Sequence, residues 1–125
     1  MRNSTSTALV KRLIESSPES LECVFFSSDG SSAVEVALKM AFQYWVNRGQ
    51  TGRNLFIALE GAYHGDTFGA MGVSGVETFR GLFRPLLVEG LYARNPYLHP
   101  RSPDADWEAV ATECTQHLEV LLTEN

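Results

Sequence analysis

The fold of this chain is decided by residues 23–39, which read CVFFSSDGSSAVEVALK. Residues 23–26 are an apolar run rich in side chains that favour β-structure, which predicts a buried strand. Residues 27–32 are turn and helix-capping types. A helix is expected from Ala33 to about Asn47. Most of its surface should be buried against a sheet or another subunit, because polar side chains recur only every four residues. A strand, a loop and a helix in this order are typical of an α/β fold.

Three further segments flank this unit. Residues 5–17 place their apolar side chains on one helical face, and the Ser-Ser-Pro run at 16–18 ends that helix. Residues 55–59 are apolar throughout and predict a second strand. Residues 60–67, EGAYHGDT, then form a glycine-containing loop.

The second half of the chain is less regular. Residues 75–103 carry four of the five prolines and no steady period, so we expect a loop with short elements. A helix should begin at Asp104 or Asp106 and run to about His117, and residues 118–122 look like the start of a third strand. The predicted fold class is α/β, with a mostly parallel sheet flanked by helices. A third strand with no helix to cover it would leave that domain incomplete.

Composition narrows the classes of function. With 125 residues, 44% of them hydrophobic and 20% charged, the chain has the make-up of a globular unit. Its net charge of −5 argues against a nucleic-acid partner, and its apolar runs are too short to span a membrane. Cys23 and Cys114 lack the spacing of metal ligands. We therefore expect two buried, reduced thiols, no metal site and a cytoplasmic protein, or a mitochondrial one in a eukaryote.

Residues 27–32 indicate an anion-binding loop. The free amides in the first turn of a helix attract negative charge. Gly30 lets a ligand approach the backbone, and the hydroxyls of Ser31 and Ser32 can donate hydrogen bonds. The segment lacks the lysine of a Walker loop and the spacing G-x-G-x-x-G, which disfavours a nucleotide site of either kind. Capping of the helix with nothing bound is the alternative.

The loop at Tyr63, His64 and Gly65 is a second candidate. It follows the strand at 55–59, at the end where open α/β sheets hold their ligands. A planar, phosphorylated heteroaromatic cofactor would fit two such loops, with its ring on Tyr63 and its phosphate at the first loop. The alternatives are a core tyrosine and a structural histidine, although His64 could also serve as a base or a metal ligand.

Four blocks of the sequence resemble one protein family, namely residues 23–26, 29–41, 43–45 and 63–71. These blocks are similar to the class III aminotransferases, which use pyridoxal 5′-phosphate (PLP) and have the fold called type I. The resemblance implies that the chain is part of the large PLP-binding domain of such an enzyme.

The resemblance also implies roles for single residues. Gly30 and Ser31 would hold the cofactor phosphate. Tyr63 would stack on the pyridine ring and face the substrate, and Glu35 would support the cofactor loop as a structural residue. The secondary candidates for the same site are Ser32, His64 and Gly65.

Within the family, the resemblance is strongest to members that serve biotin synthesis. It implies transfer of an amino group from S-adenosylmethionine to 8-amino-7-oxononanoate, which gives 7,8-diaminononanoate, in a homodimer. The alternatives are another class III aminotransferase acting on an ω-amino acid or a diamine, a non-catalytic interaction fragment, and a small hydrolase that uses Ser31 and His64. One departure from the family pattern concerns the first loop, where Ser28 replaces the usual aspartate and Asp29 directly precedes the glycine.

Transamination also needs a lysine that forms a Schiff base with the cofactor. Of the two lysines in the chain, Lys39 lies nine residues beyond Gly30, or about 13 Å along a helix. Lys11 precedes the first strand and has no motif around it. Neither lysine is a credible Schiff-base residue. We therefore expect residues 1–125 to be a fragment of the PLP-binding domain that contains no catalytic residue and is inactive alone.

Overall fold

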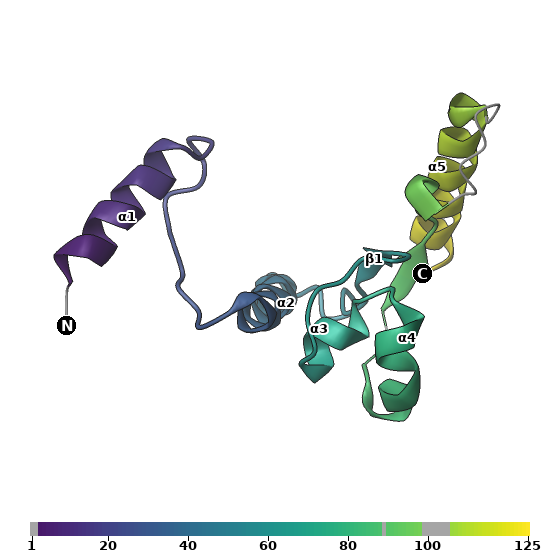
Figure 1. Ribbon diagram of the computed structural model, residues 1–125, viewed down its shortest axis with the longest axis horizontal. Coiled ribbons are helices and arrows are strands. Elements are labelled where there is room, and N and C mark those ends of the chain that lie inside the picture. The colour runs from purple at the N-terminus through teal and green to yellow at the C-terminus, as the bar shows by residue number, and fades with distance from the viewer. Residues whose placement is uncertain (1–2, 89, 99–105) are drawn as a thin grey trace.

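The computed structural model describes residues 3–88, 90–98 and 106–125. Helices alternate with two short strands along the chain, as Figure 1 shows. This arrangement agrees with the predicted α/β class, although each strand has only three residues. The elements are α1 (Ser4–Glu15), α2 (Gly30–Asn47), β1 (Ile57–Leu59), α3 (Phe68–Gly72), α4 (Glu77–Arg80), the 3-10 helix η1 (Gly81–Leu86), β2 (Leu91–Ala93), the 3-10 helix η2 (Pro96–Leu98) and α5 (Trp107–Glu124).

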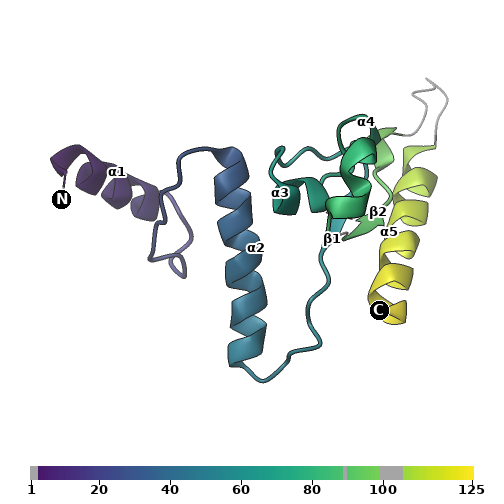
Figure 2. The same cartoon turned by 90° about the horizontal axis from the view of Figure 1, so that it is seen from below.

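The two strands lie side by side and run parallel. Ile57 pairs with Leu91, and Leu59 pairs with Ala93. The strands lie between α2 and α5, as both ribbon views show (Figures 1 and 2). Helix α5 packs against β2, and α2 packs against α3. The buried apolar side chains that result are small in number and come mainly from β1, α3, β2 and α5: Ala58, Ala70, Met71, Val73, Ala93 and Cys114.

Helix α1 forms where the sequence predicts it. The side chain of Asn3 caps its first turn by accepting a hydrogen bond from the Thr5 amide at 3.0 Å. Its end is closed by the Ser16 amide, which donates to the Arg12 carbonyl. The helix stands apart from the other elements in both views (Figures 1 and 2). Its apolar residues Leu9 and Leu13 are therefore exposed.

The predictions of a buried strand at 23–26 and of a buried Cys23 are wrong. Residues 23–26 form no strand but an extended, exposed segment, in which Phe25 is 63% exposed and Cys23 is exposed as well. A strand needs a neighbour to pair with, and within the described ranges none lies beside this segment. Helix α2 has no buried residue, and its apolar side chains such as Met40 and Phe42 face solvent. The sequence indicates correctly that this helix has apolar sides. The described residues do not cover them, and their burial against another subunit stays a prediction.

The predictions for the second half need a larger correction. Residues 118–122 are helical and belong to α5, which Asp106 caps through hydrogen bonds from the Glu108 and Ala109 amides. The alternative cap, Asp104, lies outside the described residues. The apolar run at 118–122 continues the helical face of Cys114. Its helical spacing therefore decides the structure of this run, although its residue types favour a strand. The second strand, β2, instead lies inside the proline-containing stretch, where three residues are too few to give a periodic signal.

Candidate functional site

The first half of the site is the N-terminus of α2. The carboxylate of Asp29 accepts a hydrogen bond from the Ser32 amide at 2.8 Å, and the Asp29 carbonyl accepts one from the Ala33 amide. Helix geometry leaves the amides of Gly30 and Ser31 without a carbonyl partner inside the helix. A Cβ on Gly30 would meet no atom within 4 Å, so the space beside its backbone is open. Two amide donors at the positive end of an 18-residue helix suit an anionic ligand.

The second half is the loop between β1 and α3, residues 60–67. Gly65 has a φ of 124°, which side-chain-bearing residues rarely adopt. Hydrogen bonds to Gly75 hold the start of the loop, because Gly75 donates to the Ala62 carbonyl at 2.8 Å. The hydroxyl of Ser74, which is only 2% exposed, accepts a hydrogen bond from the His64 amide at 3.0 Å. The loop backbone is therefore fixed directly after the end of β1.

The two halves lie against each other, as the sequence analysis predicts. A Cβ built on Gly65 would come within 2.7 Å of the Ser31 Cβ, so only a glycine leaves room for Ser31 at this point. Glu35, one turn into α2, joins the same elements. Its Oε1 accepts hydrogen bonds from the Thr67 hydroxyl at 2.6 Å and from the Gly69 amide at 2.8 Å. The helix end and the loop are thus packed together and hydrogen-bonded to each other.

The hydrogen bonds to Glu35 also affect its ionisation. The hydroxyl of Thr67, followed by the amides of Ala70 and Gly69, lowers the pKa of the Glu35 carboxyl, while partial burial raises it and Lys39 lowers it slightly. Glu35 is half-buried against α3, whereas Lys39, one turn further along α2, is exposed.

Tyr63 projects from the loop as an exposed ring. Its residue is 54% exposed, so the described chain leaves about half of it uncovered. The hydroxyl donates to Asp66 Oδ2 at 2.7 Å, and this hydrogen bond raises the pKa of the Tyr63 phenol. Phe79 of α4 meets the ring edge-on, with centroids 5.6 Å apart and an angle of 69° between the planes. The ring is held at its edge and at its hydroxyl, while about half of its surface stays open.

The other predicted residues have more limited parts. Ser32 is engaged by Asp29 through both its amide and its hydroxyl. His64 contributes its backbone amide to the loop, and its side chain is exposed. Among the described residues, no hydrogen bond joins Ser31 to His64, so the hydrolase alternative lacks its catalytic pair.

Three residues of the site are given no individual role from sequence, although Asp29 lies in the stretch 27–32 that is predicted to contain capping residues. Asp29 caps α2, Asp66 holds the Tyr63 hydroxyl, and Phe79 contacts the Tyr63 ring. The spacing of Asp66, three residues after Tyr63 in a tight loop, is a usable signal for the second of these. Phe79 gives no such signal, because its contact depends on how α4 returns to the loop.

The lysines lie away from the two loops. Lys11 is on the exposed helix α1 and pairs with Glu15 at 3.8 Å. Lys39 is exposed on α2, more than two turns beyond Gly30. Neither lysine therefore lies in the Gly30 turn or in the Tyr63 loop.

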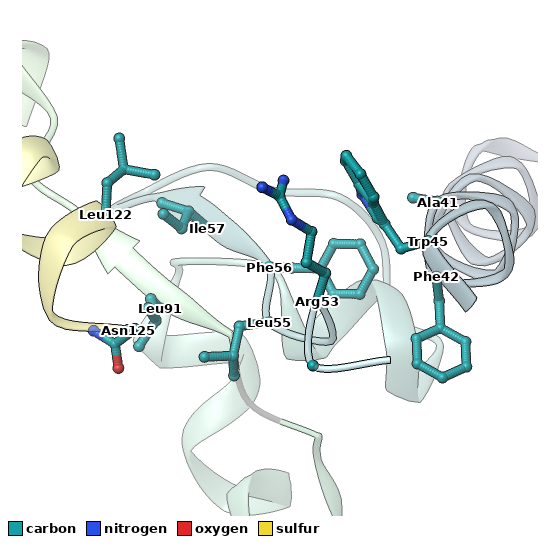
Figure 3. Close-up of a pocket in the computed structure, with 11 residues that line it drawn as sticks. Ala41, Phe42, Trp45, Arg53, Leu55, Phe56, Ile57, Leu91, Leu122 and Asn125 are labelled. Carbon is teal, nitrogen blue, oxygen red and sulfur yellow. The ribbon is translucent and has the colours of Figure 1, made fainter. Parts of the chain in front are cut away.

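A separate cavity of about 530 Å³ lies at the other end of the strands. Figure 3 shows that its lining includes Phe42 and Trp45 of α2, Ile57 and Leu91 at the starts of β1 and β2, and Arg53, which lies 4.1 Å from the centroid of the Trp45 ring. Ligand loops of parallel sheets follow the strand ends rather than the strand starts. This cavity is therefore distinct from the candidate site.

Comparison with known proteins identifies the family. The model of the family "Aminotransferase class-III" matches residues 1–125. The chain belongs to this family. A curated class III relative, the adenosylmethionine-8-amino-7-oxononanoate aminotransferase of Aquifex aeolicus, is 45% identical over 116 residues, which are 93% of this chain and 25% of the relative. The aminotransferase of the same name from Methanocaldococcus jannaschii is 50% identical over 97 residues, which are 78% of this chain and 21% of the relative.

Solved structures agree with this assignment to the class III aminotransferases. The crystal structure of the M. jannaschii aminotransferase matches with a TM-score of 0.73 and 50% identity, and covers 78% of this chain and 22% of that chain. An amine transaminase from an uncultivated Pseudomonas species, in a PLP-bound form, matches with a TM-score of 0.79 and 33% identity over 98% of this chain and 29% of that chain. The chain spans about a quarter of the length of the curated relatives it matches.

The residues present fit the cofactor of class III aminotransferases. The open space beside Gly30 and the amides at the start of α2 suit a phosphate, and the uncovered face of Tyr63 suits a flat ring. In the described part of the chain, no group of His, Cys, Asp and Glu side chains could hold a metal ion. No helix there is both long and apolar enough to cross a membrane.

Proposed function

We propose that this chain forms the phosphate- and ring-binding part of a PLP-dependent aminotransferase. The proposed reaction is transfer of an amino group from S-adenosylmethionine to 8-amino-7-oxononanoate, as the names of the two curated relatives suggest. One observation carries the proposal: the anion-binding end of α2 and the Tyr63 loop meet at Ser31 and Gly65. A single small ligand with a phosphate and a ring can use both.

The phosphate would be bound by the start of α2. The amides of Gly30 and Ser31 donate to it, and the Ser31 hydroxyl adds a third donor beside them. Gly30 matters because its missing side chain lets the phosphate oxygens reach the amides. These groups orient the ligand and take no part in bond breaking.

The ring would lie on Tyr63. Phe79 and Asp66 fix the tyrosine from its edge and from its hydroxyl, so little side-chain freedom is lost when a ligand stacks on it. PLP, when bound, supplies the electron sink that transamination needs. With one ring face against Tyr63, the tyrosine excludes water from that side.

The proton transfers of transamination need groups that neither the start of α2 nor the Tyr63 loop provides. Lys11 and Lys39 lie away from them, so covalent attachment of the cofactor and proton transfer at the substrate carbon would fall to a lysine elsewhere in the full-length protein.

We propose that this protein is a cytoplasmic homodimer with small-molecule substrates. Gel filtration with light scattering tests the dimer.

The test of the reaction uses the full-length protein. We expect an absorbance band near the visible edge on adding PLP, and formation of 7,8-diaminononanoate from S-adenosylmethionine and 8-amino-7-oxononanoate. Replacing the donor by an ω-amino acid or a diamine tests the second candidate, which the likeness to an amine transaminase favours. Absence of PLP-dependent transfer from every donor would rule out the proposal.

A further inference from the structure

The N-terminal end of α2, where the cofactor phosphate would bind, already carries the carboxylate of Asp29. Asp29 is the N-cap of the helix. Its Oδ1 accepts the Ser32 amide at 2.8 Å, and its Oδ2 accepts the hydroxyls of Ser32 at 2.9 Å and Ser28 at 3.2 Å. Asp29 thus accepts hydrogen bonds from three donors that could otherwise donate to a phosphate.

The charge of this carboxylate is not balanced by a neighbouring cation. In the described ranges, no Lys, Arg or His side chain forms an ion pair with Asp29. Hydrogen bonds from Ser32, first from its amide and then from its hydroxyl, lower the pKa of the Asp29 carboxyl, so it is ionised at neutral pH. The positive end of the helix dipole is therefore already paired with one anion.

A second anion at the same helix end must act against the first. A unit charge one helical turn from a doubly charged phosphate weakens binding by about tenfold, even at the dielectric constant of water. The donors that remain are the amide of Gly30 and the Ser31 hydroxyl, together with the Ser31 amide, which Asp29 engages less than it engages Ser32. They bind the phosphate beside the carboxylate and compensate for its repulsion only in part.

We propose that Asp29 sets the affinity of this site for the phosphate group by electrostatic repulsion, in exchange for capping α2. The inference rests on the proposed function, because it takes the cofactor phosphate as the ligand. It makes Asp29 a specificity-determining residue: its charge acts on phosphorylated forms of vitamin B6 and leaves unphosphorylated forms unaffected. A role in capping alone would change binding of both forms equally.

The test compares the full-length apoprotein with its Asp29→Asn variant. Asparagine caps helices as well as aspartate, so the change removes the charge and keeps the cap. The probe is pyridoxamine 5′-phosphate, which has no carbonyl and cannot bond to a lysine, so its dissociation constant reports binding alone. Unphosphorylated pyridoxamine is the ligand control. Asp29→Ser, which also keeps a capping oxygen, is the second variant if the first one folds poorly.

The chain offers a matched protein control. Asp106 caps α5, which like α2 has 18 residues, and it accepts two amides with its side chain. Asp106→Asn removes the same charge from an equivalent helix end outside the site. Circular dichroism of all variants checks that the helices are kept.

We expect Asp29→Asn to bind pyridoxamine 5′-phosphate about tenfold more tightly than the wild type, and high salt to shrink that difference. Pyridoxamine binding and the Asp106→Asn variant should show no such gain. Equal or weaker binding of the phosphate form by the Asp29 variants, or an equal gain for pyridoxamine, overturns the inference and leaves the proposed function standing. If no variant and no wild-type protein binds pyridoxamine 5′-phosphate, the proposed function fails, and this inference fails with it.

Discussion

Gly65 lies so close to Ser31 that a Cβ built on it would approach the Ser31 Cβ to 2.7 Å and its Cα to 3.0 Å. Real Cβ atoms do not come this near to other atoms without displacing them. The contact joins the end of α2 to the Tyr63 loop, although 33 residues separate the two positions along the chain. The placement of the Tyr63 loop relative to the start of α2 therefore depends on the absence of a side chain at Gly65.

Gly65→Ala is expected to push the loop away from α2. Both the clash with Ser31 and the φ of 124° oppose a side chain here, and we expect PLP binding to weaken by about tenfold or more. Titration of the full-length apoprotein with pyridoxamine 5′-phosphate measures the effect. Gly49→Ala is the control, because Gly49 also has a positive φ but no atom within 4 Å of its Cβ position. Equal losses in both variants would mean that strain alone, and not the contact, is responsible.

Glu35→Gln tests the link between α2 and α3. The charged acceptor of Thr67 and Gly69 becomes a neutral one, so we expect a loss of about 1 kcal/mol in the free energy of unfolding at neutral pH. Because the folded pKa of Glu35 is lowered, its contribution is complete above its ordinary value of 4.5 and is lost as the pH falls through the lowered value. Thermal melts at neutral and acid pH should therefore differ between wild type and variant only at the higher pH. A difference that persists below this window contradicts the role of the charge.

Tyr63→Ala and Tyr63→Phe separate the ring from the hydroxyl. Loss of the ring should weaken cofactor binding by about 0.5–1.5 kcal/mol beyond the lost area, since a stacking partner disappears. Tyr63→Phe keeps the ring and removes only the hydrogen bond to Asp66, so we expect a smaller change. Fluorescence quenching by pyridoxamine 5′-phosphate gives both values. Unchanged affinity in Tyr63→Ala would remove Tyr63 from the site.

Gly30→Val tests the approach of the phosphate to the helix end. A Cβ on Gly30 meets no protein atom within 4 Å, so we expect the fold to tolerate it while the phosphate is blocked. Binding of pyridoxamine 5′-phosphate should fall by about tenfold or more, as expected for the loss of hydrogen bonds to a charged group. Gly52→Val, also in open space but in the loop after α2, serves as the control. Wild-type affinity in the Gly30 variant would leave only a capping role for this turn.

Helices and motif loops could be predicted from sequence because their signals are local. The cap Asp106 and the residues that end α1 appear at the expected places, whereas the cap of α1, Asn3, is not predicted. The meeting of Ser31 with Gly65 also follows from the order strand, loop, helix, because loops after neighbouring parallel strands share one edge. In this chain the first of those strands is missing at 23–26, and the contact exists without it.

The wrong predictions share one cause: they depend on which segments pack together in the fold, and the local sequence does not specify this. Phe25 and Met40 are as apolar as core residues, but burial depends on a covering surface, and both are exposed. Residues 118–122 suit a strand by propensity, yet they extend a helix that already packs on β2. Phe79 reaches Tyr63 only through the return of α4, which no pattern within residues 75–103 reveals.

The three hydrogen bonds accepted by Glu35 come from residues that lie 32 to 35 positions later in the chain. During synthesis, α2 is therefore made before the residues that hydrogen-bond to its Glu35 carboxylate. The segment between them must close into a loop before the helix end and residues 60–67 can meet. The link between α2 and α3 can accordingly form only after synthesis has passed Ala70.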